Sequence, residues 1–227
     1  MKTSTLITAL AATTAVAGAA YYFRRQGRFA LAEDSSVIPI ITPVIDLAMA
    51  DYVLARIERL PSDEVTVILH TPGGCVTSCV LIADALALVP RSTAIVPYMA
   101  MSGGTLIALS ATEIAMGRNA ALSAVDPVVY GRRARHIEAG DEDGLHETAR
   151  EYEAAMRAHL QDTLRARLLA HKGEAAVARA MEVFMGVDAP HEWPIHLPAL
   201  RDLGLPVRPS ERRWAEYVDA RRDWYRR

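Results

Sequence analysis

The segment Thr93–Ala111, TAIVPYMAMSGGTLIALSA, decides the fold class of this chain. It begins as an apolar run that predicts a buried strand, breaks at Ser102–Gly104, and continues as an apolar stretch of helical length. The same order occurs once before it, where Val65–Leu69 predicts a strand, Pro72–Gly74 breaks it, and Val76–Val89 predicts a helix. Two successive strand–glycine–helix units favour an α/β domain with a largely parallel sheet.

The elements expected on either side of these units complete one domain. In chain order they are an edge strand at Val37–Ile41, a helix ending near Pro61, a strand at Glu113–Met116, a charged and solvated excursion at Gly131–Gly144, helices at about His146–Ala170 and Glu174–Met185, and a terminal helix within Ser210–Arg227. We divide the chain into a membrane anchor with a basic flank (1–28), a linker (29–36), the domain (37–207) and an aromatic and basic tail (208–227).

The two glycine junctions have the features of an acyl-transfer site. A helix beginning at each junction would present unpaired N–H groups and a partial positive charge, which are suited to stabilising an anion. The N–H groups of Gly74 and Gly103 could then meet at an oxyanion beside the hydroxyl of Ser102. The competing interpretation is that Ser102 only caps the helix that follows it.

The first 28 residues predict a membrane anchor. Residues 4–23, STLITALAATTAVAGAAYYF, carry no charge and have the length needed to cross a bilayer. They end in a pair of aromatic residues and a basic cluster (Tyr21, Tyr22, Arg24, Arg25, Arg28). This distribution of positive charge places the rest of the chain in the cytoplasm, as a single-pass membrane protein. A cleaved signal peptide is the alternative, because Ala17–Ala19 resembles a cleavage site.

Composition argues against several other functions. A formal net charge of −2 gives no electrostatic reason to expect nucleic acid as a partner. Cys75 and Cys79 are too few for a disulfide framework or a zinc site, and we expect both to be buried. The histidines outside the expected site show no spacing typical of metal ligands, so we expect neither a metal nor a cofactor.

Four motifs carry a resemblance to a known family. They are ILHTPGG (68–74), VPYMAMSGGTLIALSATEIAMG (96–117), SAVDP (123–127) and PHEWPIHLPALRDLGLPV (190–207). Over residues 37–207 the chain resembles the serine dehydrogenase proteinase family, a membrane-associated branch of the Clp-protease/crotonase superfamily related to signal peptide peptidase A. The resemblance implies a spiral of ββα units, homo-oligomers, Ser102 as nucleophile, and an oxyanion hole formed by Gly74 and Gly103.

The resemblance leaves the base that activates Ser102 open. By spacing, Asp126 falls near the position of the histidine of Clp proteases, and His191 near that of their aspartate; a triad with these two exchanged is acceptable because triads are defined by geometry. A Ser–Lys dyad would have to use Lys172, since the only other lysine is Lys2. The third alternative is a relative with no base and no activity. We expect His70 to hydrogen-bond the backbone behind the oxyanion loop.

These features predict a membrane-anchored serine peptidase that hydrolyses peptides or membrane-protein fragments, with Ser102, His191 and Asp126 as catalytic residues. Cys75, the continuation Val128–Gly131 and the charged excursion depart from the family pattern beside the expected site. Two other functions therefore stay open, an inactive oligomeric scaffold of the same fold and an acyl-CoA enzyme of the crotonase type. Although the family name contains the word dehydrogenase, the sequence has no Gly-x-Gly-x-x-Gly turn that would indicate dehydrogenase chemistry.

Overall fold

The computed structural model describes residues 36–138, 145–186 and 189–222. The N-terminal segment for which a membrane anchor is expected lies outside these ranges. Within them, no helix combines the length and the apolar character that a membrane crossing requires.

The centre of the domain is a five-stranded sheet in which every neighbouring pair is parallel. Its strands, in spatial order, are β1 (Val37–Ile41), β2 (Glu64–His70), β3 (Arg91–Val96), β5 (Glu113–Met116) and β10 (Val207–Pro209). The first four confirm the strands expected from their apolar and β-branched runs. β1 lies at an edge, where the missing N–H of Pro39 removes no ladder bond from a central strand.

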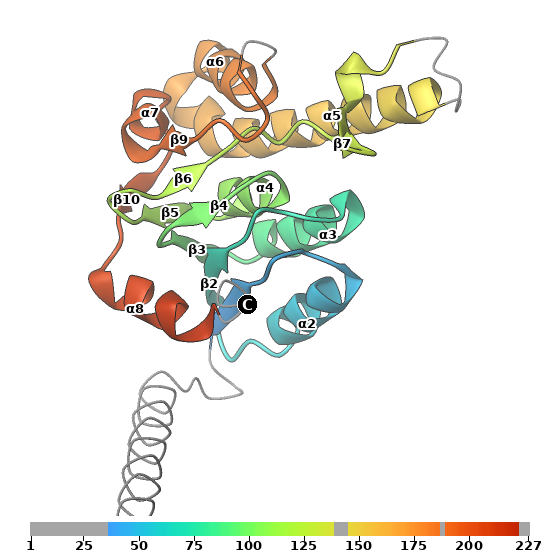
Figure 1. Ribbon diagram of the computed structural model, residues 1–227. Helices are drawn as coiled ribbons and strands as arrows, with labels where there is room; N and C mark the ends of the chain where they lie inside the picture. The colour runs from blue at the N-terminus through green and yellow to red at the C-terminus, as the bar shows by residue number, and fades with distance from the viewer. Residues whose placement is uncertain (1–35, 139–144, 187–188, 223–227) are drawn as a thin grey trace, which may run out of the picture.

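Helices cover both faces of this sheet (Figure 1). On one face lie α2 (Leu47–Ile57), α3 (Val76–Ala87) and α4 (Gly103–Ser110), and on the other lies α8 (Arg212–Arg221). Because side chains alternate along a strand, adjacent residues of β2 pack on opposite faces of the sheet, in different hydrophobic clusters. Leu69 packs in the main core, whereas Ile68 packs with Tyr217 and Val218 of α8.

A second layer lies above the sheet and α4 in the view of Figure 1. It contains a small sheet of β4 (Met99–Ala100), β6 (Ala121–Leu122) and β9 (Ile195–His196), a hairpin of β7 (Val128–Val129) and β8 (Arg132–Arg133), the short helix η1 (Ala134–His136), and the helices α5 (Leu145–Lys172), α6 (Glu174–Met185) and α7 (Leu197–Asp202). β4 pairs parallel with β6, and β6 pairs antiparallel with β9. The expected α/β architecture with a largely parallel sheet is confirmed.

Three expectations need correction or refinement. The charged excursion is not solvated throughout, because Ala134 and Ile137 are only 1% and 3% exposed and the two arginines around Ala134 face inward. Cys79 is buried as expected, but Cys75 is exposed at the start of α3. The C-terminal helix packs on the sheet of the domain itself, through the cluster around Ile68.

Candidate active site

Ser102 stands at the junction between β4 and α4 in a backbone conformation that few non-glycine residues adopt. Its φ of 52° and ψ of −119° lie outside the helical and extended regions. Such a conformation costs on the order of 1–3 kcal/mol and is found mainly at functional sites. Its side chain makes no capping hydrogen bond to α4, so the interpretation of Ser102 as a simple helix cap is not supported.

A buried chain of hydrogen bonds holds the backbone at Ser102. Its N–H donates to Oγ of Ser123 at 2.8 Å, and this hydroxyl donates to the carbonyl of Ala124 at 3.0 Å. The N–H of Ser123 donates to Oγ1 of Thr105 at 2.9 Å, and Thr105 donates to the carbonyl of Ala100 at 2.7 Å. Ser123 and Thr105 are fully buried. The network therefore ties the SAVDP segment to both ends of the Ser102 junction.

The first glycine junction lies directly against Ser102. A Cβ added to Gly73, which has a φ of +112°, would lie 2.9 Å from Cβ of Ser102 and 3.2 Å from the nitrogen of Gly103. A Cβ added to Gly103 would lie 2.1 Å from Sγ of Cys79 and 3.9 Å from the nitrogen of Gly74. Both positions therefore require glycine. In the described part of the chain, the N–H groups of Gly74 and Gly103 donate no hydrogen bond, so both are available to an anion.

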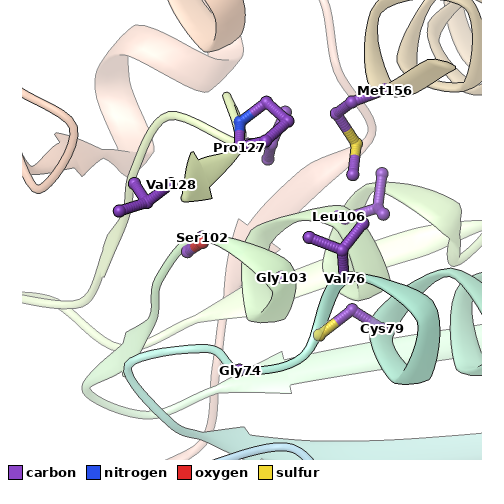
Figure 2. A pocket seen from close by; sticks show the side chains of 10 residues that line it. Gly74, Val76, Cys79, Ser102, Gly103, Leu106, Pro127, Val128 and Met156 are labelled. Atoms are coloured by element: carbon purple, nitrogen blue, oxygen red, sulfur yellow. The ribbon is translucent and has the colours of Figure 1, made fainter. Parts of the chain in front are cut away.

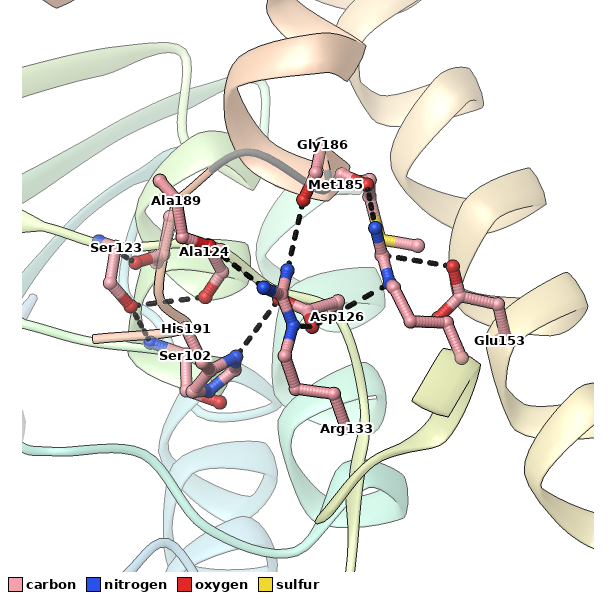
Figure 3. Close-up of polar contacts among 12 residues, drawn as sticks. Ser102, Ser123, Ala124, Asp126, Arg133, Glu153, Met185, Gly186, Ala189 and His191 are labelled. Carbon is pink, nitrogen blue, oxygen red and sulfur yellow. Dashed lines mark hydrogen bonds and ion pairs between the residues drawn. The ribbon is translucent and has the colours of Figure 1, made fainter. Parts of the chain in front are cut away.

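His191 and Asp126, which lie 65 residues apart in the chain, form a hydrogen-bonded pair (Figure 3). Nδ1 of His191 lies 2.9 Å from Oδ1 of Asp126. An ionised carboxylate only accepts, so Nδ1 must carry the proton, which leaves Nε2 of the neutral ring as an acceptor. Both side chains are well shielded, at 13% and 0% exposure.

Asp126 stays ionised although it is buried. Burial acts to raise the pKa of its carboxyl, but the hydrogen bonds from His191 and Arg133 outweigh this and hold the pKa below its ordinary value. Nε of Arg133 donates to Oδ2, and Nε of Arg135 lies 4.0 Å from the same oxygen. The carboxylate therefore has one oxygen for the histidine and one for the arginines.

A pocket opens beside Ser102 with a cavity volume of about 60 Å³ (Figure 2). The residues that line it carry no charge and come from both layers of the domain: Gly74, Val76, Cys79, Ser102, Gly103, Leu106, Val125, Pro127, Val128 and Met156. Val125 and Pro127 flank Asp126 in the chain, so both neighbours of Asp126 line the same pocket as Ser102. Cys79 is inert in this wall, since burial raises the pKa of its thiol to about 12.

Two other residues considered from the sequence lie elsewhere. Lys172 is exposed at the last turn of α5 and packs along Gly204. Met156, which lines the pocket, is on the same helix, and a helix rises 1.5 Å per residue, so the two are separated by about 24 Å. The ring of His70 lies on the side of α8, edge-on to Tyr98 with 5.7 Å between centroids, and not behind the oxyanion loop as expected.

This geometry is accompanied by a family match over most of the chain. The sequence model of the ClpP-like SDH-type serine proteinases matches residues 25–213. The chain belongs to this family. This is the family that its four motifs predicted.

The chain is also similar to two sequences from one archaeon. The chain is 33% identical over 172 residues to uncharacterized protein MJ0137 of Methanocaldococcus jannaschii, and 41% identical over 87 residues to uncharacterized protein MJ1495 of the same organism. These alignments cover 72% and 37% of this chain, and they span only 60% and 30% of the relatives' lengths.

Two solved structures share the ClpP-like fold. ClpP1 from Listeria monocytogenes superimposes with a TM-score of 0.55 at 17% identity, covering 80% of this chain and 96% of its own. A variant of the 1510-N membrane-bound stomatin-specific protease superimposes with a TM-score of 0.56 at 17% identity, covering 82% of this chain and 86% of its own.

The sequence did not reveal every residue that shapes the site. Ser123 lies within the SAVDP motif, but no sequence pattern distinguishes a buried serine from an exposed one. Arg133 and Arg135 lie in the segment that the sequence predicts to be solvated, since no local pattern reveals partners that lie up to 56 residues away. Only the folded chain brings these groups together.

Proposed function

We propose that this protein is a membrane-anchored serine endopeptidase in which Ser102 is the nucleophile, His191 the base, and Asp126 the residue that orients the base. The observation that carries the proposal is the hydrogen bond between His191 and Asp126, in a protein whose Ser102 shares a pocket with both neighbours of Asp126. Triads are recognised by this kind of geometry and not by their order in the chain.

In the proposed reaction, Oγ of Ser102 attacks the carbonyl carbon of a peptide bond while its proton passes to Nε2 of His191. The carbonyl electron pair moves to oxygen, where the N–H groups of Gly74 and Gly103 donate to it. When this pair returns, the C–N bond breaks and the departing amine takes the proton from Nε2. A water molecule then attacks the Ser102 ester in the same way and releases the carboxylic acid.

In the described residues, no hydrogen bond joins Ser102 to His191. Catalytic hydrogen bonds are often long in substrate-free enzymes and tighten when substrate binds. Figure 3 shows the hydrogen bonds of both residues in one close-up of the site. The absence of this bond in the free protein therefore does not count against His191 as the base.

The proposed substrate is a peptide with a small apolar side chain before the cleaved bond. The pocket of about 60 Å³ beside Ser102 holds no charged residue among those that line it. A charged side chain would lose its hydration there without gaining a partner. We expect short aliphatic residues to fit and charged residues to be rejected.

The membrane assignment is a proposal that rests on the charge-free segment 4–23 and the arginines after it. A solved structure of the same fold is described as a membrane-bound protease, which supports the proposal. We place the catalytic domain on the cytoplasmic side, with protein or peptide substrates and with further copies of this chain as partners.

Labelling with a fluorophosphonate probe tests the proposal. In full-length protein purified in detergent, we expect the wild type to be labelled and both Ser102→Ala and His191→Ala to lose labelling while they remain folded. Labelling that persists in Ser102→Ala would exclude this serine as the nucleophile. A folded wild type that takes no label and cleaves no peptide library would instead indicate the inactive scaffold.

A further inference from the structure

The guanidinium of Arg133 joins three separate parts of the site (Figure 3). Its Nε donates to Oδ2 of Asp126, its Nη1 to the carbonyl of Ala189 at 2.7 Å, and its Nη2 to the carbonyl of Gly186 at 2.9 Å. The side chain is only 12% exposed. All three nitrogens of the planar group are used, which a flexible single-point cation could not reproduce.

The local chain explains how Arg133 reaches Asp126. β7 and β8 form a hairpin in which Val128 pairs with Arg133 and Val129 with Arg132. Its two turn residues, Tyr130 and Gly131, have φ values of 49° and 78°, as a tight hairpin turn requires. The hairpin folds the chain back so that Arg133 returns to the start of its own strand pair, beside Asp126.

The contacts of Arg133 bear on the position of His191. Ala189 precedes His191 by two residues, so the bond to its carbonyl holds the segment that carries the imidazole. The hydrogen bond from Nε of Arg133 occupies Oδ2 of Asp126, while Oδ1 accepts from Nδ1 of His191. One side chain thereby fixes both partners of the His191–Asp126 hydrogen bond.

We propose that Arg133 is a positioning residue that holds His191 and Asp126 in the geometry needed to activate Ser102. The inference rests on the proposed function, but it concerns a residue outside the triad that touches neither substrate nor the reacting atoms. A buried carboxylate that lost this cation would keep only one strong hydrogen bond, and the histidine segment would lose an anchor.

The test compares Arg133→Gln and Arg133→Lys with a matched control, Arg167→Gln. Arg167 is a partly buried arginine on α5, and it donates to the carbonyl of Ser110 at the end of α4. Its loss should lower stability without touching Asp126 or His191. Two measurements are made at a temperature where circular dichroism shows every variant folded: the rate of fluorophosphonate labelling, and the proton NMR spectrum.

The proton on Nδ1 of a histidine that donates to a carboxylate resonates far downfield, and its absence in His191→Ala assigns the signal. We expect Arg133→Gln to lose this signal and to label at least tenfold more slowly than the wild type. Arg133→Lys should not restore either property, because one ammonium cannot bridge three acceptors. Arg167→Gln should keep the signal and label within about threefold of the wild type.

Wild-type labelling in folded Arg133→Gln, or full recovery in Arg133→Lys, would overturn the proposal. If the wild type takes no label, the proposed function fails while the NMR comparison still decides the role of Arg133. A retained signal in Arg133→Gln would then refute the inference on structural grounds alone.

Discussion

The backbone of Ser102 adopts a conformation that is unfavourable for a residue with a Cβ, so contacts with neighbouring residues must stabilise it. A strained φ/ψ pair of this kind costs on the order of 1–3 kcal/mol. The 2.8 Å bond from its N–H to Ser123 is one compensation, and the close packing of Gly73 against its Cβ is another. The position of the hydroxyl is therefore set by residues from two other segments of the chain.

Ser123→Ala tests this dependence. The substitution leaves the N–H of Ser102 without its acceptor inside the protein, and an unsatisfied buried group costs about 1–3 kcal/mol. We expect the free energy of urea unfolding to fall by that amount and the labelling rate to fall about tenfold.

Ser110→Ala is the matched control for this substitution. Ser110 is also a buried serine, but its hydroxyl donates only to Leu106 within its own helix, at 3.0 Å. The free energy of unfolding of Ser110→Ala should fall by less than about 1 kcal/mol, and its labelling rate should equal that of the wild type. Equal effects of the two substitutions on labelling would contradict the role given to Ser123.

Among the secondary structure elements, α8 has the clearest structural task. It covers the face of β2 that carries Ile68, and it contributes Tyr217 and Val218 to a small core there. Tyr98 also bonds α8, since its hydroxyl donates a hydrogen bond to Asp219 at 2.9 Å. The sheet would otherwise expose an apolar face to water, which accounts for a helix beyond the last strand.

Tyr217→Ala should show how much this packing contributes. The side chain is 2% exposed, and removing a buried aromatic ring typically costs about 3–5 kcal/mol. Tyr130, which is 85% exposed at the hairpin turn, gives the control, and its replacement by phenylalanine should change stability by less than about 0.5 kcal/mol. Urea unfolding of both variants gives the comparison, and a loss below about 1 kcal/mol in Tyr217→Ala would mean that α8 docks only weakly.

For the molecule as a whole, we expect His70 to make stability depend on pH. Burial lowers the pKa of its imidazole from 6.5 to about 4, with Arg222 adding to the effect and Asp219 opposing it. Between pH 6.5 and about 4, the unfolded chain therefore binds a proton at His70 that the folded chain does not bind. Stability is fully present above pH 6.5 and declines as the pH falls toward 4, by an amount on the order of 3 kcal/mol.

The check is urea unfolding at several pH values between 7 and 4 for the wild type and His70→Phe. The variant keeps an aromatic ring against Tyr98 but has no titrating group, so its stability should fall less steeply with decreasing pH. Parallel profiles for the two proteins would show that other groups cause the acid sensitivity.

The sequence predicted the strands and helices around the site because their signals are local. β2 and β3 are short β-branched runs bounded by turn residues, and α6 falls at the expected residues Glu174–Met185. The glycine junctions were equally visible. The buried part of the 131–144 segment was not, since a run of arginines and acidic residues indicates solvent unless its partners are known.

Sequence patterns were enough to indicate the family, the order of strands and helices, and the residues whose type is informative: Ser102 before two glycines, Gly74, and the two motifs that contain Asp126 and His191. The folded chain was needed to show that His191 bonds Asp126, that Lys172 lies far along α5, and that Arg133 also bonds the segment before His191. The physical reason is that local patterns follow from the period of a helix or strand. Hydrogen bonds between residues more than 50 positions apart depend instead on how the two layers of the domain close on each other.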